Sequence, residues 1–202
     1  LGVDSTANKG DGANEMGSNL QVTMSNVLKV SLGESTTCAI TAGFTVHCWG
    51  RGGYLGYDDT STRKTPGPPL LLGKDAVDIK TGYRTTCALF KDGSAKCWGM
   101  NWHGMLGQGV SNGDQGDGAG EMAALSFINL SGTGNEAWLI YPGTYTTCAV
   151  IDGKVACWGL SDQGQAGGSV CNYECYEPEG SQDYGYGAVT YTYAYGSKVP
   201  MV

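Results

Sequence analysis

The sequence predicts an all-β, β-propeller-like repeat protein with three disulfide-stapled hairpin blades and a partial fourth blade. Three observations lead to this prediction: a motif that occurs three times, a pair of cysteines around a turn in each copy, and 34 glycines among 202 residues. Glycine adopts positive φ angles without steric penalty, so this content favours many tight turns. No stretch has the convincing apolar period of an amphipathic helix.

Each copy of the motif begins with Thr-Thr-Cys-Ala and ends with Cys-Trp-Gly. The tryptophans of successive copies are about 50 to 60 residues apart, a spacing typical of propeller blades. We therefore expect a single repeat domain over residues 1–202, with repeats at 1–56, 57–109 and 110–168 and a partial repeat at 169–202. A second motif, Asp-Gly-Ala-x-Glu-Met, occurs at 11–16 and 117–122 and explains the extra length of the third repeat.

The turns inside the motif predict hairpins. Asp152-Gly153 lies between two short apolar runs, and this dipeptide favours a two-residue type I′ turn because both positions need positive φ. Residues 91–93, Lys-Asp-Gly, suit a three-residue loop with glycine in the left-handed position. Each copy of the motif is therefore predicted to fold as an antiparallel hairpin.

The chain has eight cysteines, and six of them lie opposite each other in the predicted hairpins. Directly opposed Cα atoms of an antiparallel ladder are ~4.5–5.5 Å apart, within reach of a disulfide. The predicted pairs are Cys38–Cys48, Cys87–Cys97 and Cys148–Cys157, with Cys171–Cys175 closing a small loop. Two alternatives stay open, namely a metal site, although Cys-x-x-Cys spacing does not occur, and reduced cysteines in a cytosolic propeller.

Disulfides indicate an oxidising, extracellular setting. Asn129-Leu130-Ser131 is an N-glycosylation sequon, so Asn129 is expected at the surface of a glycoprotein if the chain is secreted. The chain begins at Leu1 rather than at Met, which is consistent with a removed leader. Leu1-Gly2 also matches the Leu-Gly that ends a repeat.

Residues 82–107 carry the fullest form of the repeat: Gly-x-x-x-Thr-Cys-Ala-Leu, then Asp-Gly-x-x-x-Cys-Trp-Gly-x-Asn, and finally Leu-Gly. This pattern resembles the regulator of chromosome condensation repeat. The resemblance implies a β-propeller, usually of seven blades, in a family that includes nucleotide exchange factors, a light sensor and secreted inhibitors. No residue here matches the inserted wing of the exchange factors. Trp49, Trp98 and Trp158 are interpreted as core anchors rather than light-absorbing groups.

Composition argues against several functions. The net charge is −7 and the 12 basic residues are scattered, which disfavours nucleic acids and anionic membranes. No apolar run approaches the ~20 residues of a membrane span. The only histidines are His47 and His103, and no catalytic motif is visible, so we expect no enzyme. Asp114, Asp117 and Glu121 form a weak calcium candidate in a glycine-rich loop, otherwise a turn-rich insertion, and no other cofactor is expected.

The end of the chain contains a tyrosine-rich strand over residues 189–195. Its alternation places Val189, Tyr191, Tyr193 and Tyr195 on one face. We read this strand as the start of the partial fourth unit. Three explanations for the incomplete propeller stay open: a small or irregular closed propeller, a fragment of a longer one, or open ends that a neighbouring chain completes.

The predicted function is a non-catalytic, secreted structural or assembly subunit that forms a head-to-tail extracellular fibre or surface coat. In this hypothesis the tyrosine face or residues 1–30 contact a neighbouring copy of the chain. The alternative hypothesis is a soluble recognition propeller that binds or inhibits another protein.

Overall fold

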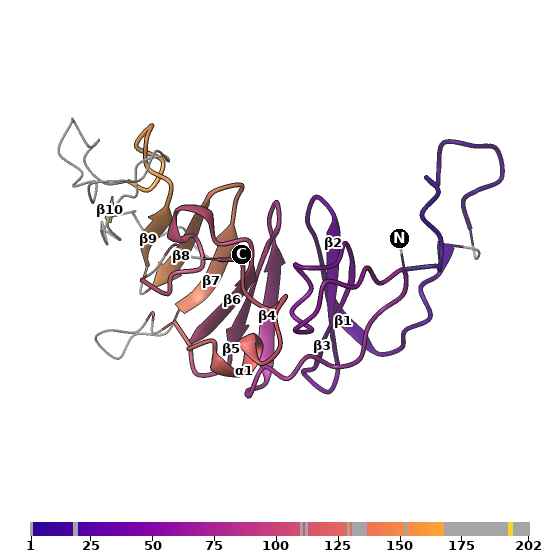
Figure 1. Cartoon of the computed structure of the whole chain (residues 1–202), viewed down its shortest axis with the longest axis horizontal. Helices are drawn as coiled ribbons and strands as arrows, with labels where there is room; N and C mark the ends of the chain where they lie inside the picture. The colour runs from indigo at the N-terminus through magenta and orange to yellow at the C-terminus, as the bar shows by residue number, and fades with distance from the viewer. Residues whose placement is uncertain are drawn as a thin grey trace.

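The computed structural model describes residues 2–17, 20–109, 111, 113–128, 130, 137–151, 153–167 and 194–195. Within them the chain forms three antiparallel sheets that stand side by side in chain order (Figure 1). The sheets contain β1 (Val27–Leu32), β2 (Thr36–Thr41) and β3 (Val46–Gly50); β4 (Ala76–Thr81), β5 (Thr85–Phe90) and β6 (Ala95–Gly99); and β7 (Ala137–Pro142), β8 (Thr146–Ile151), β9 (Lys154–Gly159) and β10 (Ala194–Tyr195). The described helices are η2 (Trp102–Gly104) and α1 (Glu121–Ala124).

A disulfide joins β2 to β3, β5 to β6 and β8 to β9, which confirms the predicted fold with three stapled hairpins. The bonded pairs are Cys38–Cys48, Cys87–Cys97 and Cys148–Cys157, each with Cα atoms 4.1 Å apart and directly opposed in the ladder. Every cysteine that the structure describes is bonded in this way. The middle hairpin has the predicted loop, because the backbone N–H of Phe90 donates to Ser94 and Gly93 has a φ of 75°.

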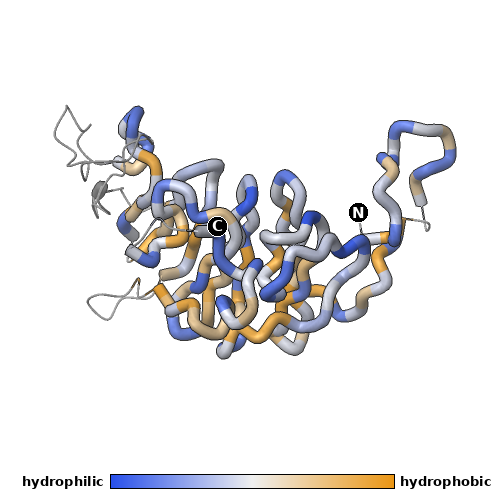
Figure 2. Tube along the Cα trace, in the orientation of Figure 1, coloured by the Kyte–Doolittle hydropathy of each residue, from blue (hydrophilic) through white to orange (hydrophobic). Residues whose placement is uncertain are grey.

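The hydrophobic core lies between the sheets rather than beneath a single one. One apolar cluster joins the first and second sheets around Ile40, Phe90 and Trp98, and another joins the second and third around Leu89 and Ile140. Hydrophobic segments follow the strands of all three sheets in Figure 2. Strand β4 packs against β1 and β2, and β7 packs against β4 and β5. This stacking of like units is the packing expected of a propeller.

A glycine from one repeat covers the tryptophan of the next sheet. A Cβ atom on Gly56 would lie 2.7 Å from Nε1 of Trp98, and one on Gly107 would lie 2.9 Å from Nε1 of Trp158. Gly2 covers Trp49 in the same way, with a distance of 2.9 Å. The Leu-Gly motif therefore places a residue without a side chain against an indole ring, and Gly2 takes this position as its sequence suggests.

A fourth segment runs beside the last strand of each hairpin. Leu70 donates its N–H to Val46, Ile128 pairs with Ala95, and Ala194 of β10 pairs with Val155, all at the same register position. Strand β10 is thus an added strand of the third sheet of its own chain. The pattern of residues 189–195 predicts a strand of a fourth unit, but an alternating pattern does not determine which strand it pairs with.

Candidate functional site

A row of aromatic and cationic side chains crosses all three sheets at one end. The members of this aromatic row are Arg51, Tyr54, Tyr83, Arg84, Trp102, His103 and Tyr145, and each contacts another member through a ring. They come from the segments after β3 and β6 and from the β4–β5 and β7–β8 turns. No member was predicted from the sequence as a site residue.

Tight turns present the residues of the row. In the turn between the first two strands of each sheet, the N–H of the glycine donates to the threonine three residues later, at 2.8 Å for Gly33, Gly82 and Gly143. Only two residues remain at each tip, and in the second and third sheets they are Tyr83-Arg84 and Thr144-Tyr145. The aromatic and basic residues that come directly before Thr-Thr-Cys in the second and third repeats are the sequence signal that could have located this surface.

Arg84 connects the first and second sheets within the row. Its guanidinium carbon lies 4.6 Å from the ring centroid of Tyr83 and 5.6 Å from that of Tyr54. Its Nε donates to Glu34 at 3.3 Å. Cations over aromatic faces are attracted by the ring quadrupole, and the carboxylate further limits the rotamers of the arginine. Arg84 and its two rings are therefore held in place before any partner binds.

Tyr145 connects the second and third sheets. Its ring stacks on Trp102 with centroids 6.2 Å apart and an interplanar angle of 8°. The rings of His103 and Tyr83 lie 5.7 Å and 6.4 Å from it. Trp102 stays 55% exposed despite this stacking. The large apolar surface of a fixed tryptophan is thus presented to solvent.

The backbone after β6 holds Trp102 outward. Asn101, the residue before it, is buried, and its side-chain oxygen accepts the N–H of Leu106 at 3.2 Å. His103 has a φ of 60°, a left-handed conformation that is uncommon for residues other than glycine. This short extension after Cys-Trp-Gly is two residues longer than its counterpart in the first repeat, which lacks an equivalent of Trp102.

The calcium candidates take part in backbone contacts. A single carboxylate oxygen of Glu121 accepts the N–H groups of Gly116, Asp117 and Gly118 at 2.8 to 3.1 Å. The N–H of Gly118 is the main cause of a lowered pKa for Glu121. Asp114 accepts the N–H of Asn101 at 3.2 Å. Among the described residues, no group of three acidic, cysteine or histidine side chains is arranged to hold a metal.

The first copy of the Asp-Gly-Ala-x-Glu-Met motif makes the same kind of contact. Glu15 accepts the N–H groups of Gly10 and Gly12, both at 2.9 Å. The N–H of Gly12 is the main cause of the lowered pKa of Glu15. We infer that the motif organises a glycine-rich loop around its own glutamate, which favours the turn-rich interpretation of the insertion.

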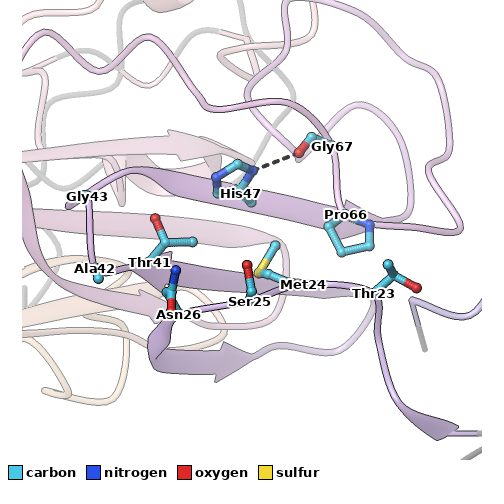
Figure 3. Close-up of a pocket in the computed structure, with 10 residues that line it drawn as sticks. All are labelled: Thr23, Met24, Ser25, Asn26, Thr41, Ala42, Gly43, His47, Pro66 and Gly67. Atoms are coloured by element: carbon cyan, nitrogen blue, oxygen red, sulfur yellow. Dashed lines mark hydrogen bonds between the residues drawn. The ribbon is translucent and has the colours of Figure 1, made fainter.

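His47 lines a small pocket of about 440 Å³ beside the β2–β3 turn (Figure 3). Its Nδ1 lies 2.9 Å from the carbonyl oxygen of Gly67 and its Nε2 lies 3.2 Å from the hydroxyl of Thr45. A carbonyl only accepts, so Nδ1 carries a proton in this hydrogen bond. In the described part of the chain, neither histidine contacts a carboxylate that would orient it as a catalytic base.

Several predicted site residues lie outside the described residues, namely Asn129, Cys171, Cys175, Val189, Tyr191 and Tyr193. The backbone of Tyr195 pairs with Lys154 of β9. Across the part of the chain that is described, no helix is long and apolar enough to cross a membrane. The interface proposed for the tyrosine-rich strand stays a prediction.

Comparisons with known proteins identify the repeat. Residues 76–104 match the regulator of chromosome condensation (RCC1) repeat. A search of curated proteins found no match. The predicted resemblance is confirmed by the matched repeat and by the fold of solved structures.

Three solved structures show the same fold. A chain in the crystal structure of Kap60 bound to yeast RCC1 (Prp20) aligns with 83% of this chain, with a TM-score of 0.64 and 19% identity. Prp20p from Saccharomyces cerevisiae, in a structure described with its binding to Gsp1p and histones, aligns with 71% at a TM-score of 0.56 and 22% identity. Human WBSCR16 aligns with 66% at a TM-score of 0.57 and 19% identity. The alignments cover 37%, 33% and 33% of those chains, so this chain spans about a third of their length.

Proposed function

We propose that this chain of RCC1-type repeats is a protein-binding propeller and that the aromatic row is its binding surface. The observation that carries the proposal is the unbroken series of ring contacts from Arg51 to Trp102 across three sheets. Tryptophan, tyrosine and arginine are the residues that contribute most to protein interfaces. Because the rings already hold each other, little side-chain entropy is lost on binding.

The solved neighbours and the composition support a protein partner. Two of the neighbouring structures concern Prp20, one bound to Kap60 and the other described with its binding to Gsp1p and histones, and these partners are all proteins. The acidic net charge of −7 disfavours nucleic acid for this chain. We propose binding rather than catalysis, because the two histidines contact a carbonyl, a hydroxyl and an aromatic ring.

We further propose that the chain works in an oxidising, extracellular compartment. The support for this setting is the disulfide at the same register position of all three hairpins. Glycosylation at Asn129 belongs to the same proposal. Mass measurement of the native protein without reductant tests it, and free thiols at Cys87 or Cys97 would contradict it.

A selection experiment tests the binding surface. A displayed library of random 16-residue peptides is selected on the folded, oxidised chain, and the binders are then measured on variants. We expect the strongest binders to lose affinity for Trp102→Ala and Tyr145→Ala. The matched control is Leu71→Ser, which changes an apolar residue that is 88% exposed and is not a member of the row. Binders that keep full affinity for both row variants would contradict the proposal.

A second candidate function is head-to-tail assembly through the free face of the first sheet. Val30, Ile79 and Ile140 are equivalent in the three ladders, yet Val30 is 55% exposed whereas Ile79 is 1% and Ile140 is 0% exposed. The isoleucines are covered by the preceding sheet. The third sheet of a second copy would cover Val30 in the same way, since Val155 of that sheet is 38% exposed.

Head-to-tail assembly predicts that the molar mass of the particle in solution rises with protein concentration. Sedimentation should detect oligomers of the wild type, and Val30→Asp should abolish them. The Leu71→Ser variant should assemble like the wild type. A wild-type chain that stays monomeric at millimolar concentration would exclude this candidate and leave peptide binding untouched.

A further inference from the structure

The three described disulfides occupy the same register position but differ in exposure. The four cysteines of the first and second sheets are fully buried, namely Cys38, Cys48, Cys87 and Cys97. In the third sheet, Cys157 is 8% exposed and Cys148 is partly exposed. Strand β8 pairs with β7 on one side and with β9 on the other, so the exposed surface of Cys148 belongs mainly to its side chain. Among the three, only the disulfide of the third sheet is within reach of solvent molecules.

The stacking of the sheets explains this difference (Figure 1). The disulfide of the first sheet belongs to the apolar cluster that contains Ile79 and Phe90 of the second sheet, and the disulfide of the second sheet belongs to the cluster that contains Ile140 of the third. In the described part of the chain no sheet follows the third, so the same face of that sheet is less covered. Val155 on this face is 38% exposed, whereas its equivalent Val46 in the first sheet is buried.

We propose that Cys148–Cys157 is a thiol-exchange site, which small thiols of the glutathione class reduce while the disulfides of the first and second sheets stay closed. Exposed disulfides exchange most readily, because the attacking thiolate must reach a sulfur atom. A thiolate attacks Sγ of Cys148, forms a mixed disulfide with it and releases Cys157 as a thiolate. A second small thiol then attacks the mixed disulfide, frees Cys148 and leaves as the oxidised disulfide of the reductant. The two small thiols thus lose the two electrons that the cysteines gain, and their protons pass to the cysteines.

The same disulfide joins two residues that hold the segment after Trp102. The hydroxyl of Thr147 and Nε1 of Trp158 donate to one carbonyl, that of Met105, at 2.8 and 3.0 Å. Thr147 lies opposite Trp158 in the ladder, and each is the neighbour in sequence of one of the bonded cysteines. The N–H of Met105 in turn donates to the carbonyl of Trp102 at 3.4 Å. The disulfide is therefore connected to the exposed indole of the aromatic row through three hydrogen bonds.

The second sheet does not share this connection. Nε1 of Trp98, the equivalent of Trp158, is buried and has no hydrogen-bond partner among the described residues. The exposed disulfide is thus also the one whose opening reaches the aromatic row. Its reduction removes the covalent link between β8 and β9 beside Thr147 and Trp158, which lowers the free energy needed to open their two hydrogen bonds to Met105. Reduction therefore leaves the segment after Trp102 less firmly held.

Differential alkylation of the full, oxidised chain tests the exchange site. The protein is incubated with reduced glutathione at neutral pH, free thiols are blocked with iodoacetamide at intervals, and the labelled cysteines are located by mass spectrometry. We expect Cys148 and Cys157 to be labelled at least about tenfold faster than Cys87 and Cys97, which serve as the internal control. Equal labelling rates for the two pairs, or no labelling of Cys148 and Cys157, would overturn the proposal.

Amide hydrogen exchange of residues 101–107 tests the connection to the aromatic row. We expect these amides to exchange at least about fivefold faster once Cys148–Cys157 is reduced. Thr147→Val keeps the disulfide but removes one donor to Met105, so it should change the exchange in the same direction in the oxidised chain. Thr86→Val, the same change at the equivalent position of the second sheet, is the matched control and should leave the exchange as in the wild type. Unchanged exchange after reduction would overturn the connection.

The effect of reduction on peptide affinity rests on the proposed function. We expect the selected peptides to bind the reduced chain at least about fivefold more weakly than the oxidised chain, and equal affinity would overturn this effect. Neither the labelling rates nor the hydrogen exchange uses a peptide. A failure of the proposed binding surface is therefore distinguishable from a failure of the exchange site.

Discussion

The contact between Gly56 and Trp98 predicts how strongly neighbouring sheets depend on each other. Gly56 has a φ of 79°, and a Cβ there would lie 2.7 Å from Nε1 and 2.9 Å from Cδ1 of Trp98. The indole is fully buried between the first and second sheets and has no room to move. Gly56→Ala therefore combines a left-handed backbone, about 1–2 kcal/mol, with overpacking, about 1–3 kcal/mol.

Gly53→Ala is the matched control for this substitution. Gly53 has a φ of 83°, but a Cβ there meets nothing within 4 Å, so only the backbone cost of about 1–2 kcal/mol applies. Urea unfolding of the oxidised chain should give a free energy of unfolding that is about 1–3 kcal/mol lower for Gly56→Ala than for Gly53→Ala. Equal destabilisation by both substitutions would refute the inter-sheet contact.

Three further predictions concern single elements of the fold. Phe44 has a φ of 56° and is 45% exposed, so Phe44→Gly should raise the free energy of unfolding by about 1 kcal/mol. Urea unfolding measures this change, and a lower free energy of unfolding would argue against a strained turn. Removal of one disulfide, as in Cys87→Ser with Cys97→Ser, should cost about 2–3 kcal/mol in thermal unfolding, and an unchanged melting temperature would contradict this. Arg63 lowers the pKa of Asp59 from 3.8 to about 2, so this pair stabilises the fold above about pH 4 and the effect is lost as the pH falls towards 2. The carboxylate is 40% exposed, so the pair contributes less than about 1 kcal/mol to stability. In Asp59→Asn the urea midpoint should therefore fall less between pH 5 and pH 2 than in the wild type.

The hairpins could be predicted from the sequence because their determinants are local. The two cysteines of a pair are 9 or 10 residues apart, and the turn between them sets which residues oppose each other. The same locality made the Leu-Gly motif recognisable, although only the structure shows that Gly56 and Gly107 lie against indole rings. Short-range spacing thus determines the units of the fold.

The aromatic row could not be predicted in this way. The contacts of Arg84 with Tyr54 and of Tyr83 with Tyr145 join residues that are distant in sequence, and they form only because the three sheets stack in register. The calcium candidate in the glycine-rich loop stays a prediction, because the same carboxylates can accept backbone N–H groups or bind a cation. Glu121 binds three of those N–H groups. Which strand a lone alternating segment joins, as for β10, is set by pairing that the sequence does not encode locally.

The affinity of the tightest selected peptide for Trp102→Ala tests the binding surface most directly. Trp102 is 55% exposed and stacks on Tyr145, so its loss should lower the free energy of unfolding by about 0.5–1.5 kcal/mol, which urea unfolding of the variant checks before binding is measured. Surface plasmon resonance should then show binding at least about tenfold weaker for Trp102→Ala, while Leu71→Ser binds like the wild type. Equal affinity of the peptide for the wild type and Trp102→Ala would contradict the assignment of the aromatic row as the binding surface.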